Sequence, residues 1–452
     1  MYQLESELII ASLCKTIEEL VNKIAGLEAE LTAIKNKKNS TNSHIPPSQD
    51  PHRVKKNQSL REPTDRKVGG QPGHVGTTLT CSKEVDVIVK HSPSKCGGCN
   101  GNLDSNMEYL VGKRQLIDIP PIALQVIEHQ VYKKQCSCGH TTVSDFPKHV
   151  ANPVQYGPNV ESLIGYLHAR QYLPYQRMKE LLNDVIGLSI STGGINNVLH
   201  RIAQKALPMY NSIKQRIEQA GVVGADETGI NIDGKNNWAW VWQNNKLTYI
   251  ICAASRGFKT IKEVFENGLP NATLIHDRWA CHFQTNAKAH QMCTAHLLRD
   301  LNYIDELYKD KCQWAKEFKA LLLEAINLKK ELTTADYFYE NKKRDALFEK
   351  LSHWLNYLIE EEHKKAKTLQ KKLLAKQDAI LHFLLQSNVV PDNNGSERAI
   401  RNIKVKQKIS GQFKTLESAN VFAILRSVID TTIKNGYEVL NALQLIATFG
   451  TE

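Results

Sequence analysis

Residues 222–228 form the stretch VVGADET, an apolar run that predicts a buried β-strand ending in an acid, Asp226. Two further strands are predicted at 238–242 (WAWVW) and 247–253 (LTYIICA), joined by the polar turn QNNK. The helical pattern FKTIKEVFENG then leads to a fourth strand, ATLIHD, which ends in Asp277, 51 residues after Asp226. Three antiparallel strands, a helix and a fourth strand are the element order of an RNase H-like sheet.

A third acid stands far downstream. Glu397 opens a predicted basic helix (SERAIR, 396–401) behind the turn PDNNG at 391–395. In an RNase H-like site the third acid comes from a later helix. Phosphodiester cleavage by two divalent ions roughly 4 Å apart needs converging carboxylates, because Mg²⁺ prefers oxygen ligands. A lone Asp at a strand end is often a turn residue, but three acids in this order predict a catalytic site for two Mg²⁺ (or Mn²⁺) ions at Asp226, Asp277 and Glu397.

A strongly basic segment follows Glu397. Residues 398–414 contain six Lys or Arg side chains and no acid. On a helix, Arg401, Lys404 and Lys408 would share a face with Glu397, where the scissile phosphate must lie. A solvated helix face is the alternative. We expect DNA-binding side chains at Arg398, Arg401, Lys404, Lys406 and Lys408, and at Arg299.

The 119 residues between Asp277 and Glu397 exceed what a compact RNase H-like sheet needs. Residues 307–389 are helix-like and dense in Lys and Glu, so they predict a helical insertion with solvated faces. Just before it, Cys293 and His296 show C-x-x-H spacing without a second half of a metal site. We expect these two side chains to pack or hydrogen-bond near the active site.

Residues 152–207 predict three helices. The first follows Gly157-Pro158, the second begins at Pro174 and is stopped by Gly187, and the third is capped by Ser191. A helix, a short glycine-containing turn and a capped helix form the layout of a DNA-binding helix-turn-helix. Ordinary helical bundles share that layout, so both interpretations stay open.

The N-terminal arm has apolar residues at alternating steps of three and four, a strict heptad repeat. β-Branched residues at position a with leucine at d favour a parallel two-stranded coiled coil. One amphipathic helix packed on its own domain is the alternative. We expect self-association through Ile10, Leu13, Ile17, Leu20, Ile24, Leu27, Leu31 and Ile34.

A basic tether follows the arm. Residues 35–67 hold nine Lys or Arg against three Asp or Glu and almost no apolar side chains, which predicts a flexible linker. Such a linker, with Lys55 and Lys56, could follow a DNA backbone, or it could be a solvated spacer.

Two cysteine pairs indicate a zinc ribbon. Cys96 and Cys99 are separated from Cys136 and Cys138 by 36 residues, and residues 114–120 and 124–132 between the pairs show strand-like alternation. Cysteine pairs on turns joined by β-structure fit one tetrahedral, structural Zn²⁺. Since the second pair is a shortened C-x-C, His140 could replace one cysteine as the fourth ligand. Four reduced thiols without metal are the alternative.

Several motifs, in order along nearly the whole chain, resemble the insertion-sequence 66 (IS-66) family of bacterial DDE transposases. The resemblance implies an RNase H-like catalytic domain with a helical insertion, two-Mg²⁺ strand transfer of element ends, and companion proteins encoded by the same element. The family's two Asp and one Glu match Asp226, Asp277 and Glu397, while Phe283 corresponds loosely to a family aromatic. The motifs are NSTNSHIPPSQD (39–50), GGQPGHVGTTL (69–79), RQLIDIP (114–120), GADETG (224–229), HDRWACHF (276–283), CTAHLLRDL (293–301) and DNNGSERAIRNIKVKQKISG (392–411).

Composition narrows the class of protein. The 452 residues carry a net charge of +11, with 41% hydrophobic and 23% charged residues, which excludes a collagen-like or wholly disordered chain. No apolar run is long enough for a membrane span, and the acidic start MYQLESELII is unlike a signal peptide. Ten cysteines are too few for a disulfide scaffold. We expect a cytoplasmic, nucleoid-associated bacterial protein that does not contact membranes.

The predicted function is that of a DNA transposase. Water would cleave the terminal phosphodiester of the element, and the freed 3′-OH would attack target DNA. The alternatives are a non-catalytic DNA-binding regulator and an RNase H-like nuclease acting on branched DNA. The predicted multidomain α+β layout is a coiled coil (1–37), a basic linker (38–80), a zinc ribbon (81–148), a helical DNA-binding segment (149–207), an RNase H-like core in two parts (208–306 and 390–452, the latter with C-terminal helices) and a helical insertion (307–389).

Overall fold

The computed structural model describes residues 13–21, 23–24, 26–27, 79–105, 107–309 and 311–449. The chain divides into two compact units, one of Met1–Arg53 with Val126–Glu452 and one of Val54–Gln125. The first unit is a mixed α+β structure with one large sheet and many helices.

The large sheet has five strands in the order β5-β4-β3-β6-β7. The first three strands in sequence are antiparallel neighbours, and β6 and β7 run parallel to β3. Strand β3 is longer than predicted, so Asp226 lies inside it and not at its end. The strand continues because Ile230 and Ile232 still point into the core. The strands are β3 (Val222–Ile232), β4 (Lys235–Gln243), β5 (Thr248–Ala253), β6 (Leu269–His276) and β7 (Ala287–Met292).

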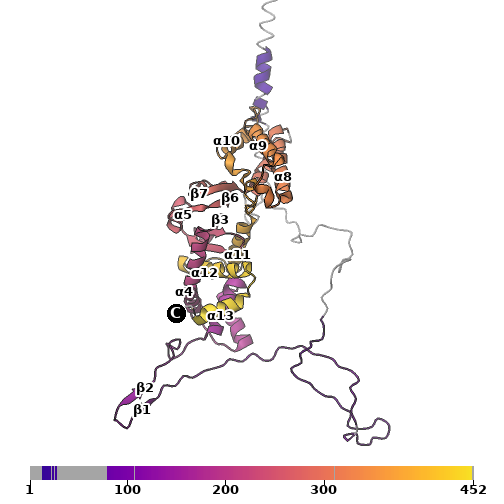
Figure 1. The fold of residues 1–452 in the computed structure, drawn as a ribbon, viewed down its shortest axis with the longest axis vertical. Coiled ribbons are helices and arrows are strands. Elements are labelled where there is room, and N and C mark those ends of the chain that lie inside the picture. Colours follow the sequence, from indigo (N-terminus) through magenta and orange to yellow (C-terminus); the bar gives the residue numbers. More distant parts are fainter. Residues whose placement is uncertain are drawn as a thin grey trace, which may run out of the picture. The chain divides into compact units, whose positions relative to one another are not determined.

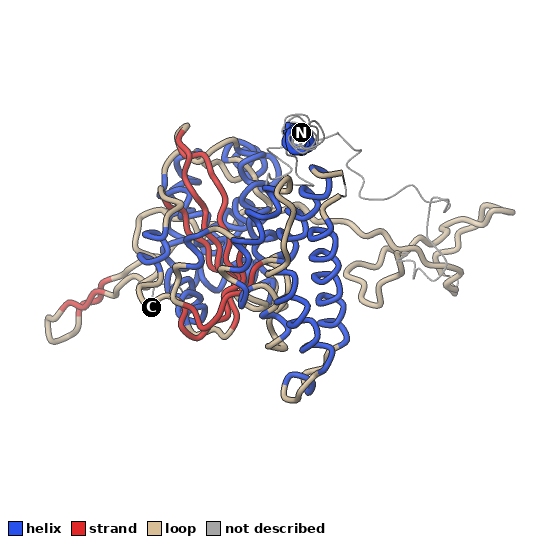
Figure 2. The backbone as a smooth tube through the Cα atoms, turned by 90° about the horizontal axis from the view of Figure 1, so that it is seen from above, coloured by secondary structure: helices blue, strands red, loops and turns tan. Residues whose placement is uncertain are grey.

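Helices cover both sides of the sheet (Figure 2). Helices α4 and α12 pack against β5 and against each other, and α11 lies over β3 and β4 (Figure 1). Their core is rich in aromatic rings, with Trp240 stacked on Trp242 and Phe265 against the edge of Trp242. These helices are α4 (Thr192–Glu218), α5 (Phe258–Val264), α6 (Ala280–Phe283), α7 (Thr294–Leu307), α11 (Asn394–Ser410), α12 (Leu416–Lys434) and α13 (Val439–Phe449).

The segment at 152–207 forms the three predicted helices. Gly187 ends the second one in the left-handed region (φ 76°), and the Ser191 hydroxyl accepts a hydrogen bond from the Gly194 N–H at 2.9 Å. The third helix, α4, continues past the predicted border at 207, and its apolar face joins the core of the sheet. The first helix is α2 (Pro158–Gly165), which continues as the short π-helix Tyr166–Arg170. The second is α3 (Tyr175–Leu181), which continues as the short π-helix Leu182–Ile186.

The predicted insertion is helical, and its core is shared with Ile275 of β6 and Met292 of β7. Trp314, Phe318 and Phe383 are fully buried there, and the Trp314 indole N–H donates to the Trp354 carbonyl at 2.7 Å. The insertion lies beyond the β6–β7 side of the sheet (Figure 1). Its elements are α8 (Gln313–Glu331), α9 (Lys342–Leu355) and α10 (Lys364–Leu374), with 3₁₀ turns at Ala335–Tyr337, Gln377–Ala379 and His382–Leu384.

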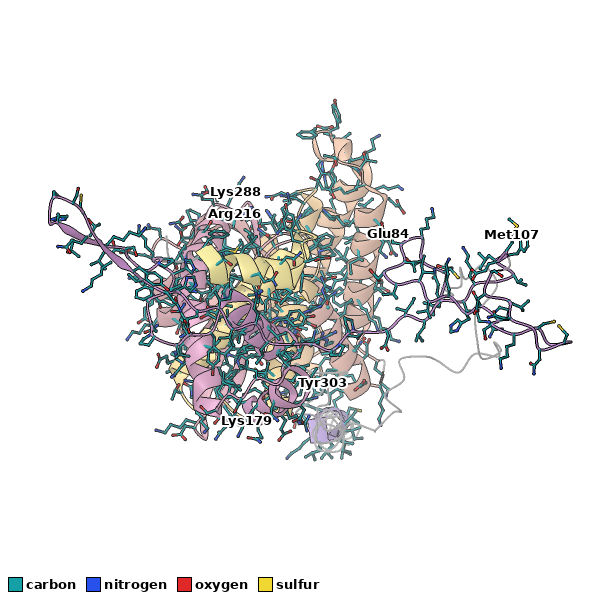
Figure 3. All side chains as sticks on the ribbon, turned by 90° about the horizontal axis from the view of Figure 1, so that it is seen from below. Glu84, Met107, Lys179, Arg216, Lys288 and Tyr303 are labelled. Atoms are coloured by element: carbon teal, nitrogen blue, oxygen red, sulfur yellow. The ribbon has the colours of Figure 1, made fainter. Side chains whose placement is uncertain are left out.

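The strands predicted at 114–120 and 124–132 are wrong, since neither range contains a strand. Alternation alone does not make a strand, because a strand also needs a pairing partner and a core to cover its apolar face. Here Leu116 and Val126 are more than 90% exposed. The side chains of Glu84 and Met107 likewise point outward from open loops (Figure 3). Between residues 126 and 150 the chain forms one hairpin, β1 (Lys133–Gln135) paired with β2 (Thr141–Val143).

Part of the N-terminal heptad pattern falls on described residues, and these are helical. Ile10, Leu31, Ile34, Lys55 and Lys56 lie outside the described part of the chain. Within that part, no helix combines the length and apolarity that crossing a membrane requires. The five described heptad side chains, all between 53% and 59% exposed, are Leu13, Ile17, Leu20, Ile24 and Leu27.

Candidate active site

The sheet register brings Asp226 and Asp277 to one place. Strand β6 pairs with β3 in parallel at Val222↔Thr273, Val223↔Leu274 and Gly224↔Ile275. Asp226 of β3 and Asp277, the residue that follows β6, each lie two residues beyond the last of these pairs, and the charge of Asp277 acts on Asp226. Pairing stops before these residues, so two carboxylates leave adjacent strands where the strands separate.

Glu397 reaches the same place because α11 docks closely on β3. The Asn393 side-chain amide donates to the Ala225 carbonyl at 2.7 Å, directly before Asp226. The Ser396 hydroxyl donates to the Asn393 side-chain oxygen at 2.7 Å, which fixes the first turn of α11. Gly224 permits this approach, because a Cβ there would lie 2.7 Å from the Asn393 oxygen and 2.9 Å from the Ser396 hydroxyl.

The start of α7 holds the same turn from the other side. The Thr294 N–H and hydroxyl both donate to the Pro391 carbonyl at 2.9 Å, and the Cys293 sulfur accepts from the Asn393 N–H at 3.2 Å. Burial raises the pKa of Cys293 to about 11, so this thiol stays protonated. Cys293 therefore packs and hydrogen-bonds beside the acids, and its pairing with Asn393 gives the CTAH motif a role in placing Glu397.

The acids around Asp226 act on it electrostatically. The pKa of Asp226 lies well above its ordinary value, first because the carboxyl is desolvated and then because Glu227, Asp277 and Glu397 add negative charge around it. Asp226 therefore stands in a desolvated place with three other carboxyl groups around it. Such a cluster is the environment in which a divalent cation binds favourably.

Two of the acids have fixed partners. The Asp277 side chain accepts a hydrogen bond from the Trp279 N–H at 2.8 Å, which turns the chain sharply after β6. Glu397 forms an ion pair with Arg299 of α7, with Arg299 Nη2 3.4 Å from Glu397 Oε1. Arg299 was predicted to contact phosphate, and the structure places it against the third acid.

A buried network beside Asp226 could not be foreseen from the sequence. Glu227 accepts from Arg256 through one oxygen (2.7 Å to Nη2) and from His282 through the other (2.9 Å). Burial raises the pKa of Glu227, but His282 and Arg256 more than offset that effect, so its pKa lies below the ordinary value. The only sequence signal was the position of Glu227 next to Asp226.

The basic residues of α11 do not form a single surface. Arg398, Arg401 and Lys408 are exposed, whereas Lys404 is half-buried and donates to the Gly229 carbonyl. Lys406 corrects the prediction, because it is 3% exposed. Its ammonium lies 3.3 Å from the Leu173 carbonyl and 3.3 Å from His168 Nδ1. An interior side chain held this way is not available to a DNA backbone.

The donor set suits the metal that it was predicted to hold. Three carboxylates offer oxygen ligands of the kind that Mg²⁺ prefers, and one of them, Glu397, is already paired with Arg299. In the part of the chain that the structure describes, no group of three or more His, Cys, Asp or Glu side chains lies close enough to hold a metal ion. At the three acids, the ion pair between Arg299 and Glu397 would have to break before Glu397 could bind a metal ion.

Each cysteine pair lies on a tight turn. Backbone N–H groups of Cys99 and Gly98 face the Cys96 sulfur, and those of Cys138 and Ser137 face the Cys136 sulfur. These hydrogen bonds lower the pKa of both leading thiols, which favours the thiolate form that zinc binds. Gly139 adopts φ 88° in the hairpin turn that bears the second pair.

Comparison with known families agrees with this geometry. A family model described as "Transposase IS66 family" matches residues 153–421, more than half of the chain, and one described as "zinc-finger binding domain of transposase IS66" matches residues 93–139. The protein is a transposase, and it binds DNA. Specifically, the chain belongs to the IS66 family of transposases. A family of unknown function matches residues 2–80, and no curated protein matches.

Proposed function

We propose that this transposase cuts and joins DNA in an RNase H-like core whose catalytic residues are Asp226, Asp277 and Glu397. The observation that carries the proposal is the parallel β3–β6 register, because Asp226 and Asp277 each follow its last pair, Gly224 and Ile275, by two residues. Strand order β5-β4-β3-β6-β7, with the last two strands parallel to β3, is the order of an RNase H-like sheet. The docking of α11 on Ala225 supports Glu397 as the third acid.

The three carboxylates would hold two Mg²⁺ ions. Bound there, the ions would polarise the attacking oxygen and stabilise the leaving oxygen of a phosphodiester. The exposed Arg398, Arg401 and Lys408 extend from the same helix as Glu397, and they would hold the DNA backbone beside the acids. Lys406 takes no part in this contact, because it lies in the interior.

The reaction would proceed in two transfers at phosphorus. In the first, a water oxygen bonds to the phosphorus at the element end, and the bond to the 3′ oxygen breaks. In the second, that 3′ oxygen bonds to the phosphorus of a target phosphodiester and gives up its proton, while the bond from that phosphorus to the target's own 3′ oxygen breaks and leaves a new 3′-OH. The pKa of Asp226 is raised first by burial and then by the negative charge of neighbouring acids, and a bound cation would offset that negative charge.

Zinc binding and self-association complete the proposal. Cys96, Cys99, Cys136 and Cys138 would bind one structural Zn²⁺, and the zinc-finger match covers these four residues but ends before His140. The helical arm exposes an apolar heptad seam, which a second copy of the same helix would cover. The DNA-binding partners would be element ends and target DNA.

The assignment is tested by nicking of DNA that carries candidate element ends, with and without Mg²⁺. We expect Asp226→Asn and Glu397→Gln to abolish cleavage while retaining binding of element ends. The matched controls are Asp345→Asn and Glu349→Gln, two exposed acids of α9 that should leave cleavage unchanged.

A second readout separates metal binding from catalysis. Mg²⁺ should raise the unfolding temperature of the wild type and of the α9 controls but not that of Asp226→Asn, because only a ligand of the native state stabilises it. Normal cleavage by Asp226→Asn would exclude the catalytic assignment. DNA binding without any cleavage by the wild type would favour the non-catalytic regulator.

A further inference from the structure

Trp279 is an exposed aromatic side chain at the candidate active site. It follows Asp277 by two residues, and its backbone N–H donates to the Asp277 carboxylate at 2.8 Å. The side chain is 40% exposed, whereas Trp240, Trp242 and Trp314 are at most 1% exposed. Water contact on so large an apolar ring costs free energy that burial would have recovered.

One face of the Trp279 ring is already covered. The Arg256 guanidinium lies 4.0 Å from the centre of the Trp279 ring and 4.7 Å from the centre of the Trp238 ring, so it stacks on two indoles. Because Arg256 occupies one face, the exposed area of Trp279 lies on the rest of the ring.

The support beneath Trp279 is rigid. Arg256 is bound by Glu227 at 2.7 Å, and the Glu227 carboxylate is itself 1% exposed. The other oxygen of Glu227 binds His282, which is fully buried. A charged chain of this length, anchored in the interior, fixes Arg256 and with it the plane of the indole.

We propose that Trp279 is a stacking platform for an unpaired DNA base next to the phosphate held by the acids. This inference rests on the proposed function, because it takes Asp277 as the mark of the scissile phosphate. Every base presents an aromatic face to a ring, so stacking would hold the strand end without reading its sequence. Because the Trp279 N–H is hydrogen-bonded to the Asp277 carboxylate, a base stacked on Trp279 would lie at a fixed position relative to that acid.

The test uses single-stranded DNA oligonucleotides, each carrying one 2-aminopurine at a different distance from the 3′ end. Binding is followed without added Mg²⁺ and without a chelator, so that strand cleavage plays no part and bound zinc is kept. At one probe position the wild type should quench the fluorescence by stacking. Trp279→Ala should lose that quench and bind about tenfold more weakly, whereas Trp279→Phe should retain most of both.

The control is Phe338→Ala, which removes an aromatic side chain that is 79% exposed on the insertion. It should bind the probes like the wild type. Equal quenching by wild type and Trp279→Ala at every probe position would overturn the proposal, and so would an equal loss in Phe338→Ala. Since nicking is measured separately, failure of the stacking site and failure of the catalytic assignment give different results.

Discussion

Among single residues, Glu227 has the most demanding environment. Its carboxylate is almost fully buried. One oxygen binds the Arg256 guanidinium, and the other binds the His282 imidazole. Removing one member of such a buried set leaves the other groups desolvated and unpaired, which costs more than the interaction itself contributes. Glu227 therefore couples the stability of the sheet to the position of Arg256 and Trp279.

Replacing Glu227 by Gln should lower the free energy of unfolding at neutral pH by about 3 kcal/mol. Because the folded pKa lies below the ordinary value of 4.5, the stabilisation is complete above that value and is lost as the pH falls through the folded pKa. Urea unfolding between pH 7 and pH 3 should show a shallower acid dependence for the variant. An unchanged profile would exclude the ion pairs as its origin, and the exposed Glu349→Gln is the control.

The sequence leads to three candidate acids but not to the residues that support them. Asp226, Asp277 and Glu397 follow from strand and helix patterns, which are local. Glu227, Arg256 and His282 come from separate segments, and only the tertiary fold brings them together. The burial of Lys406 could have been predicted from the sequence. Lys406 follows Glu397 by nine residues, which places it on the opposite face of a helix with 3.6 residues per turn.

Between elements, the contact of α11 with β3 decides where the third acid lies. Gly224→Ala would place a Cβ 2.7 Å from the Gln243 amide and from the Asn393 oxygen, so the first turn of α11 must move. We expect a loss of about 1–3 kcal/mol in unfolding free energy. Cleavage should fall far more than the small loss of folded protein explains, because Glu397 moves with the helix.

The matched control is Gly221→Ala, just before β3, where a Cβ meets nothing within 4 Å. Measuring DNA nicking and thermal unfolding on both variants separates displacement of Glu397 from general instability. Full activity in Gly224→Ala would show that the close approach is not needed.

Element prediction succeeded where local signals and packing agree. Ser191 and Gly187 mark helix ends chemically, and both do so in the structure. The strand prediction failed at 114–120. The alternating apolar side chains there have no partner strand and no core to pack against, so a strand gains no stability. The length of α4 was underestimated because its second half is defined by contact with the sheet.

For the whole molecule, zinc should determine whether the cysteine-bearing region is folded. We expect one Zn²⁺ per chain by metal analysis, and its loss in Cys96→Ser and Cys136→Ser. Limited proteolysis should then cut residues 81–148 faster while the five-stranded sheet stays resistant. Cys81→Ser, which removes an exposed thiol from the same region, should retain zinc. Full zinc in both pair variants would contradict the four-cysteine site.

The assembly state should depend on the apolar seam of the N-terminal helix. Leu20 occupies position d and is 53% exposed in the single chain, so Leu20→Lys should place a charge in the coiled-coil core. Sedimentation velocity should then show monomers at concentrations where the wild type is dimeric. Glu19→Lys, on the adjacent outer position, should leave the dimer intact, and equal dissociation of both variants would argue against a coiled coil.

The hydrogen bonds from Thr294 to Pro391 and from Asn393 to Cys293 join the chain just before the insertion to the chain just after it. These hydrogen bonds hold the two ends of the insertion together beside the candidate acids. The end of the insertion also bonds to the sheet, because Gln291 of β7 binds the Ile380 carbonyl and the Phe383 N–H. A foreign domain should therefore be grafted into the loop between α8 and α9, away from these bonds, if the positions of the second and third acids are to be kept.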